Sequence, residues 1–185
     1  MGTDNIDEFI IITRKIYGLE SKIPQSIFET NSFLFEKEPF LIEYAAFFGS
    51  IQIIRYLIMN NAKIPPSIWL YAIHSKNAEL IHLIEEQKVL PIDKTYVECF
   101  IESIKCHHND FADYLELNLL STSFEKHSNN DVESSIFEYH NYYQFNDEFK
   151  NTDIFYLMCK FGFCDILMLL NFKENYERTL NLEFV

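Results

Sequence analysis

Glycine and proline are scarce in this sequence, with 4 and 5 of them among 185 residues. All-β folds need these two residues at their many turns, so the shortage favours helices. Hydrophobic residues make up 48% of the chain and aromatic residues 16%, which is enough apolar surface for a core and argues against long disorder. The length fits one domain or one short array of repeats.

Basic residues are also few: 15 Lys and Arg stand against 28 Asp and Glu, and the formal net charge is −13. A surface of that sign repels a phosphate backbone and an anionic lipid surface. No apolar stretch reaches the roughly 18 residues that a membrane-spanning helix needs. We therefore expect a protein partner, and neither nucleic acid nor a membrane.

The four cysteines form no Cys-x-x-Cys pair, and a chain of this size does not need disulfide bonds to fold. We expect all four thiols to be reduced. The N-terminal segment MGTDNIDEF is acidic and lacks the basic, apolar and small-residue order of a signal peptide. These features predict a cytoplasmic protein. The cysteines are Cys99, Cys106, Cys159 and Cys164.

An internal repeat is the most informative feature of the chain. Its first copy spans residues 40–62. Ala45 and Ala46 are small enough to let one helix lie close to its neighbours, and Gly49 allows a tight turn into a second helix. The second helix then carries an apolar stripe, formed by Ile53, Ile54 and Leu57.

Three further copies span residues 67–84, 103–115 and 155–170. In every copy a Gly, Lys or His is followed three residues later by an acidic or amide residue and then by two apolar ones. The acidic or amide residue is expected in the first turn of the second helix, where a negative charge complements the helix dipole. The residues that open this junction are Gly49, Lys76, His107 and Gly162.

Residues 40–62 resemble the ankyrin repeat, whose pattern runs TPLHxAAxxGHxEIVxxLLxxGA. The turn signature is lost, because Phe40-Leu-Ile-Glu43 stands where TPLH would be. Successive copies lie 27 and 31 residues apart, closer than the roughly 33 of ankyrin repeats. The resemblance therefore implies helix pairs with short loops in place of hairpin fingers.

The motifs at residues 43–52, 67–74 and 102–110 are similar to a large family of ankyrin-like proteins of parasitic protists that carries a domain of unknown function. The resemblance covers roughly residues 35–170. It implies an all-α stack, or solenoid, of ankyrin-like helical repeats, with no known catalytic residue and no assigned partner. No cofactor and no metal ligand is predicted.

The chain divides into a cap, a repeat array, an interruption and a further repeat. Within the cap we expect helices at residues 5–17 and 25–35, and within the interruption a loop at 121–131 and a lone helix at 134–143. The predicted boundaries are 1–38 for the N-terminal helical cap, 39–120 for three helix pairs, 121–152 for the acidic loop and degenerate helix, 153–172 for a further pair and 173–185 for a tail.

In ankyrin repeats the two residues before the glycine face the concave groove and vary with the partner, so the resemblance places partner-binding residues there. Phe47 and Phe48 would make a good anchor, because buried aromatic residues dominate interface energies. The alternative, that the N-terminal cap packs over both, carries equal weight. The predicted partner-binding residues are Phe47, Phe48, His74, Ser75, Lys105, Cys106, Lys160 and Phe161.

The predicted function is a non-catalytic protein–protein interaction module that binds an unidentified partner through its concave helical face. The alternative is a metal-dependent or hydrolytic enzyme that uses the Cys and His residues at 99–108. A single zinc ion cannot be bound by all four residues of this segment, which are Cys99, Cys106, His107 and His108. The adjacent residues Cys106 and His107 diverge by about 100° on a helix, and Cys99 lies roughly 10 Å from Cys106 along the helix axis.

His74 and His82 could flank a groove as a catalytic pair, but we expect both at surface positions. Trp69, the single tryptophan, is expected in the core.

Overall fold

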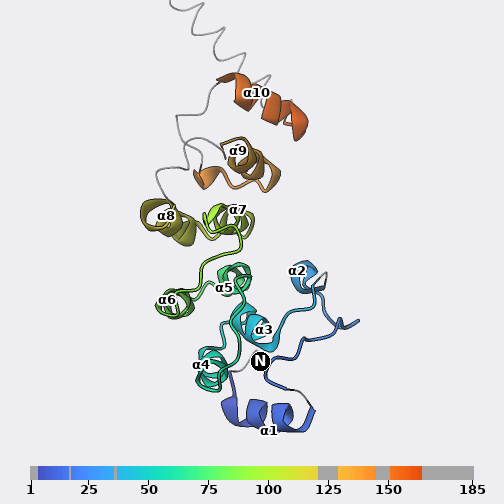
Figure 1. Cartoon of the computed structure of the whole chain (residues 1–185). Coiled ribbons are helices and arrows are strands. Elements are labelled where there is room, and N and C mark those ends of the chain that lie inside the picture. Colours follow the sequence, from blue (N-terminus) through green and yellow to red (C-terminus); the bar gives the residue numbers. More distant parts are fainter. Residues whose placement is uncertain (1–3, 17, 36, 121–128, 145–150, 164–185) are drawn as a thin grey trace, which may run out of the picture. The chain divides into compact units, whose positions relative to one another are not determined.

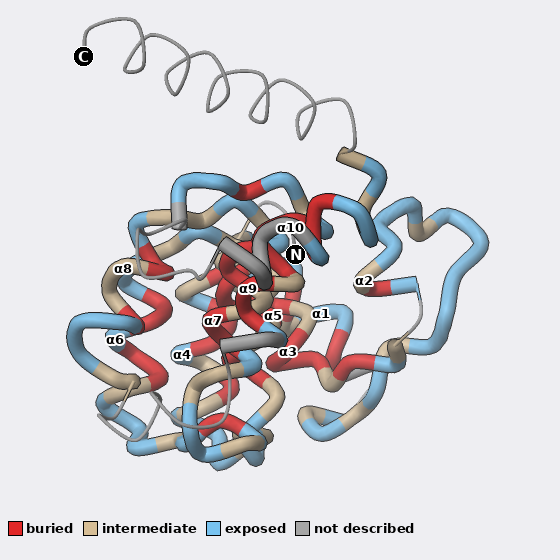
Figure 2. The backbone as a smooth tube through the Cα atoms, turned by 90° about the horizontal axis from the view of Figure 1, so that it is seen from above, coloured by how far each residue is buried: buried red, intermediate tan, exposed pale blue. Residues whose placement is uncertain are grey.

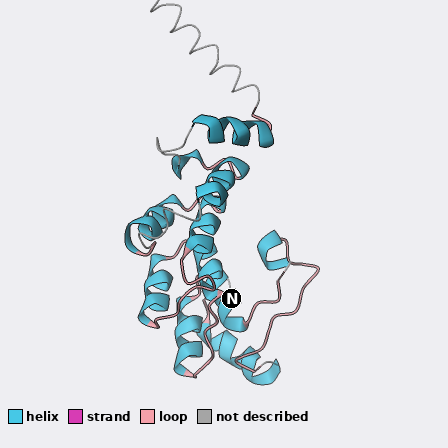
Figure 3. Cartoon of the chain, turned by 45° about the horizontal axis from the view of Figure 1, so that its top comes forward, coloured by secondary structure: helices cyan, strands magenta, loops and turns pink. Residues whose placement is uncertain are grey.

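The computed structural model of the chain falls into two compact units, Met1–Phe124 and Glu125–Val185. In the described part the regular structure is helical, and the only strand-type pairing is an isolated bridge between Lys22 and Phe40 (Figure 3). The predicted all-α class is confirmed. No helix in this part is both long and apolar enough to cross a membrane. The structure describes residues 4–16, 18–35, 37–120, 129–144 and 151–163.

The first unit contains two N-terminal helices followed by three helix pairs (Figure 1). The first helices of the pairs pack in series, α3 on α5 and α5 on α7, and each packs against the second helix of its own pair. The N-terminal helices are α1 (Ile6–Ile16) and α2 (Ser32–Phe35), and the pairs are α3 (Leu41–Phe47) with α4 (Ile51–Met59), α5 (Ile68–Ser75) with α6 (Ala78–Glu86), and α7 (Val97–Lys105) with α8 (Asn109–Asn118).

Small residues line the contacts between the first helices. Ala45 in α3, Ala72 in α5 and Ser103 in α7 occupy matching positions and are fully buried, at 0% exposure. Side chains of this size allow helix axes to approach closely, which is the role the sequence predicts for Ala45. The buried stretches of α3, α5 and α7 gather in the interior of the unit (Figure 2).

The residue that opens the recurring junction adopts a left-handed conformation in every copy, with φ of 64° at Gly49, 53° at Lys76, 51° at His107 and 83° at Gly162. Three of the four first helices then close with a hydrogen bond from the next backbone N–H to a carbonyl five residues back, at 2.8–2.9 Å. This is the Schellman arrangement, which ends a helix by satisfying its last carbonyls. The mixed Gly, Lys and His pattern thus marks a left-handed residue in all four turns and the Schellman hydrogen bond in three of them.

Replacing Lys76 by glycine is expected to raise the free energy of unfolding by about 0.5–1 kcal/mol, because glycine avoids the left-handed strain that other residues bear. Chemical denaturation measures the change. The matched control is Gly49→Ala, which should destabilise the protein because φ is +64° and the new Cβ would lie 3.4 Å from the Ser75 Cβ. A Lys76→Gly variant less stable than the parent contradicts the left-handed turn.

Glu43 has a structural role at the start of α3. Its side chain is buried, and its carboxylate accepts a hydrogen bond from the Phe40 backbone N–H at 2.8 Å, which caps α3. The same carboxylate accepts a hydrogen bond from the Ser67 hydroxyl, at the start of α5. One acidic side chain therefore joins two successive helix pairs.

The N-terminal segment is tied to α4. Phe9 is buried against Tyr56 with ring centroids 6.2 Å apart, and the Asp4 carboxylate accepts hydrogen bonds from the backbone N–H groups of Gln52 and Ile53 at 3.1 and 3.2 Å. These two N–H groups lie in the first turn of α4, where a helix has no internal partners for them. Asp4 thus caps a helix from a distant part of the chain.

The helix predicted at residues 25–35 is much shorter in the structure. Residues 26–28 form a turn in which the Ser26 hydroxyl accepts a hydrogen bond from the Phe28 N–H at 3.2 Å. The Asn31 side chain accepts a hydrogen bond from the Phe33 N–H at 3.0 Å and starts α2 only there. Ser and Asn side chains compete with helical hydrogen bonds in this way, and the prediction overlooked them.

The second unit contains α9 (Asn129–Glu138), a short 3₁₀ helix at Tyr142–Gln144 and α10 (Asn151–Lys160), with Phe137, Leu157 and Met158 at its core. The prediction of a loop through residue 131 is wrong from 129 on, and the lone helix ends at 138 and not at 143. The reason is a left-handed turn at His140, φ 55°, which ends α9 as the first helices end. The rest of the loop, the second helix of the last pair and the tail, residues 121–128 and 164–185, lie outside the described residues.

Candidate functional site

The C-terminal ends of α3, α5 and α7 meet, because these helices pack in series and end in equivalent turns. The ring centroids of Phe47 and His74 are 5.0 Å apart, and the Cys106 Sγ lies 3.5 Å from His74 Nδ1. Three of the residues predicted to bind a partner therefore lie together. The other five are Phe48, Ser75, Lys105, Lys160 and Phe161.

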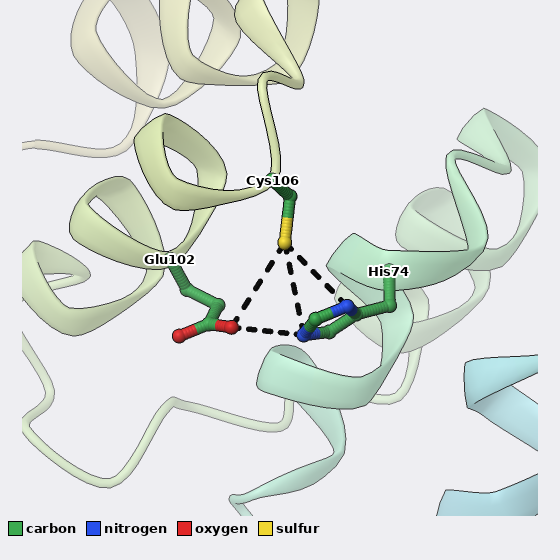
Figure 4. Close-up of side chains that lie close together, drawn as sticks. All are labelled: His74, Glu102 and Cys106. Carbon is green, nitrogen blue, oxygen red and sulfur yellow. Dashed lines mark hydrogen bonds and ion pairs between the residues drawn. The ribbon is translucent and has the colours of Figure 1, made fainter. Parts of the chain in front are cut away.

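His74, Glu102 and Cys106 form a compact polar cluster between α5 and α7 (Figure 4). His74 Nε2 lies 2.8 Å from Glu102 Oε1, and an ionised carboxylate can only accept, so the ring N–H donates. The Cys106 Sγ is 3.7 Å from His74 Nε2 and 3.9 Å from Glu102 Oε1. The side chains of His74 and Glu102 are only 15% and 13% exposed, so the expectation of a surface position for His74 is wrong.

Glu102 was missed because it does not belong to the cysteine and histidine pattern. The available signal was its spacing: it precedes Cys106 by four residues, and side chains four apart on a helix are neighbours. His74 could not be paired with Glu102 in the same way, since the two are on different helices.

Burial and the neighbouring charges oppose each other at Glu102, whereas burial and the charge of Glu102 act together on Cys106. Burial alone would raise the pKa of Glu102, but the hydrogen bond from His74 and the nearby positive charge of Lys105 lower it below its ordinary value of 4.5. The Lys105 Nζ lies 3.7 Å from Glu102 Oε2. Burial, with the negative charge of Glu102, raises the pKa of Cys106 to about 12. At neutral pH the cluster therefore holds a carboxylate beside a protonated thiol.

Phe33, which belongs to α2 in the N-terminal segment, packs against His74 of the cluster. Its ring centroid is 4.1 Å from that of His74 and 6.0 Å from that of Phe47, and the Lys37 Nζ lies 3.8 Å from the Phe33 ring centroid. Phe47 is consequently half-buried, whereas Phe48 is 43% exposed. The N-terminal segment thus covers one of the two phenylalanines and leaves the other exposed.

The remaining predicted residues are arranged differently. Ser75 is half-buried, and its hydroxyl donates to the Ala72 carbonyl at 2.7 Å and accepts from the Asn77 N–H at 3.2 Å, so it serves the turn. Lys160 and Phe161 belong to the second unit, where Phe161 packs against the core and the Lys160 Nζ lies 4.9 Å from its ring centroid.

The other Cys and His residues at 99–108 do not converge on Cys106. Cys99 is buried, and burial raises the pKa of its thiol well above the usual range. His107 is exposed, whereas His108 is half-buried, and burial with the nearby Lys76 lowers its pKa. His82 is exposed, as expected, and Trp69 is fully buried.

Asp93 positions the helix that carries Glu102 and Cys106. Its carboxylate accepts hydrogen bonds from the Thr95 hydroxyl at 2.6 Å and from the backbone N–H groups of Thr95, Tyr96 and Glu98 at 3.2–3.3 Å. Partial burial would raise the pKa of Asp93, but these hydrogen bonds favour the charged form and lower the pKa below its ordinary value of 3.8. The start of α7 therefore depends on this charge.

Replacing Asp93 by alanine is expected to cost about 0.5–2 kcal/mol of unfolding free energy at neutral pH, as for other capping side chains. A carboxyl group with a lowered pKa stabilises the folded state at every pH above its unfolded-state pKa, so the loss of unfolding free energy should be constant in that range. The loss should disappear as the pH falls below about 3.8 and through the folded-state pKa of Asp93. Denaturation at a series of pH values measures it, with the exposed Glu116→Ala as control. A cost independent of pH rules out a role for the charge.

None of the known protein families, curated proteins or solved structures compared with this chain matches it. The candidate site therefore rests on its own geometry. That geometry combines a sulfur, an imidazole and a carboxylate within 4.8 Å of one another with an adjacent aromatic group. Such a site can bind a cation through the first three or a protein side chain through the aromatic rings.

Proposed function

We propose that the chain is a non-catalytic interaction module built as an ankyrin-like repeat stack, related to the protist family that its motifs resemble. Support for the repeat comes from the serial packing of three first helices, the buried small residue in each and the recurring left-handed turn. Repeat arrays present continuous surfaces and commonly serve as binding scaffolds.

The proposed binding face lies beside the ends of the first helices, around Phe48. Its ring centroid is 5.0 Å from that of Tyr44, which is half-buried, and Glu29 lies close enough to Tyr44 that burial, together with the charge of Glu29, raises the pKa of the Tyr44 hydroxyl. This contact brings the segment before α2 alongside, with Ile27 90% and Phe28 85% exposed. Exposed apolar side chains on neighbouring segments are the observation that carries the proposal, since such groups mark protein interaction sites.

The proposed partner is an unidentified protein, and not nucleic acid or a membrane, given the net charge of −13. A cytoplasmic location is part of the proposal. Its support is that Cys99, Cys106 and Cys159 are free thiols, as in a reducing compartment, while Cys164 lies outside the described residues.

Replacing Phe48 by serine is expected to abolish capture of the partner from native cell extract, because it removes the exposed anchor without touching the core. The matched control is Met59→Ser, which removes a side chain that is 81% exposed on α4, in the second-helix layer. Affinity purification with quantitative mass spectrometry compares the proteins captured by the two variants and the parent. Capture that survives Phe48→Ser, or is lost equally with Met59→Ser, contradicts the proposed face.

The hydrolytic alternative has less support. Cys106, His74 and Glu102 have the residue types of a nucleophile, a base and an orienting group. A nucleophilic cysteine needs a lowered pKa, however, and burial raises that of Cys106 to about 12. Alkylation of Cys106 at neutral pH much faster than that of the exposed Cys159 would favour the enzyme instead.

A further inference from the structure

We propose that His74, Glu102 and Cys106 form a binding site for one divalent transition-metal ion, with zinc the best fit. The donor atoms come from two neighbouring helices, one from α5 and two from α7, and all lie within 4.8 Å of one another. Most of each side chain is shielded from water, which limits competition by solvent for the ion. The inference is independent of the proposed interaction face.

The separations between the donor atoms suit tetrahedral coordination. With ordinary zinc–ligand bonds of about 2.0–2.3 Å, neighbouring ligand atoms of a tetrahedron lie about 3.4–3.6 Å apart. Only one ring nitrogen of His74 can bind a single ion. With Nε2 as that atom, the Cys106 Sγ lies 3.7 Å from it and 3.9 Å from Glu102 Oε1. The 2.8 Å hydrogen bond between His74 Nε2 and Glu102 must open, which side-chain rotation of Glu102 achieves. The proton on Nε2 must also move to Nδ1 so that Nε2 can bind the ion.

The chemistry of the donors selects the ion. Cys106 is a protonated thiol in the free site and releases its proton to solvent when it binds the ion. The resulting thiolate and the imidazole favour zinc and related transition metals, whereas calcium and magnesium require mostly oxygen ligands. Three protein ligands leave the fourth tetrahedral position for water or for a group from another molecule, as in open zinc sites. Binding would also link α5 to α7, and so join two successive helix pairs.

Lys105 opposes the ion and offers a further test. Its Nζ lies 3.7 Å from the second carboxylate oxygen of Glu102, so its charge repels a cation bound nearby. Replacing it by glutamine removes the charge and should tighten binding. A nonspecific surface site elsewhere on the chain would not respond to this change.

The experiment is a titration of the purified full chain with zinc and with cobalt, a spectroscopic substitute for zinc. We expect one ion per chain by elemental analysis and a sulfur-to-cobalt charge-transfer band. The variants His74→Gln and Cys106→Ser should each weaken binding more than about tenfold, because each removes a ligand. Cys159→Ser, which removes an exposed thiol, is the control and should leave the affinity unchanged.

Circular dichroism of each variant establishes that it is folded. Absence of stoichiometric zinc in the folded parent chain overturns the proposal. Full affinity in folded Cys106→Ser, or a cobalt complex without the sulfur band, also overturns it. The zinc stoichiometry of the parent chain is measured without any substitution. The proposal can therefore be refuted even if a variant fails to fold.

Discussion

Trp69→Ala is expected to lower the free energy of unfolding by about 3–5 kcal/mol, the range for truncating a fully buried aromatic side chain. Trp69 is 0% exposed in α5, and its indole N–H donates a hydrogen bond to the Val89 carbonyl at 2.8 Å. Its ring also packs edge-on against Tyr96, with centroids 5.2 Å apart. The residue therefore holds α5 to the loop that leads into α7, and its removal leaves a cavity and an unpaired carbonyl.

The matched variant Trp69→Phe separates these two effects, because it keeps most of the ring volume and loses the hydrogen bond. It should cost less, about 1–3 kcal/mol for the unsatisfied carbonyl of Val89 and the remaining void. Chemical denaturation followed by circular dichroism measures both variants. A loss below about 1 kcal/mol for the alanine variant would show that Trp69 is not in the core.

Deletion of residues 1–35 is expected to destabilise the first unit by several kcal/mol and to increase the binding of a hydrophobic dye. The deletion removes Phe9 and Leu34, which are 6% and 3% exposed, and burial of each such side chain stabilises by about 1.5–3 kcal/mol. It also removes the Asp4 cap of α4. Finally, it removes Phe33, so Phe47 and His74 lose their cover.

Serine at both Ile27 and Phe28 provides the control within the same segment. These side chains are 90% and 85% exposed, so the double variant should change the unfolding free energy by less than about 0.5 kcal/mol. Dye fluorescence and thermal melting compare it with the deletion. A deletion variant with parental stability and dye binding would mean that the N-terminal segment does not pack on the first helices.

The proposed zinc site and the proposed interaction face occupy adjacent regions but are tested by different substitutions. Cys106→Ser acts on the ion and leaves Phe48 in place, while Phe48→Ser acts on the partner and leaves all three donors in place. Loss of both activities in both variants would indicate that a bound ion contributes directly to partner recognition at its open coordination position.

The sequence by itself determined the all-α class and the positions of the three helix pairs that the structure describes between residues 41 and 118. The close helix contact at Ala45 and the tight turn at Gly49 follow from signals within a few residues, because helix periodicity and turn chemistry are local. The same local reasoning failed at residues 25–31, where polar side chains bond to the backbone and stop the helix.

Only the tertiary structure decided which side chains meet. Asp4 caps α4 across 48 residues, and His74 bonds to Glu102 across 28. Phe33 covers Phe47 and leaves Phe48 exposed. From the sequence alone, an exposed Phe47–Phe48 anchor and a cap that packs over both residues carried equal weight. Such contacts depend on how helices pack and on what else is buried beside them, and neither is encoded in the spacing of residues along a single element.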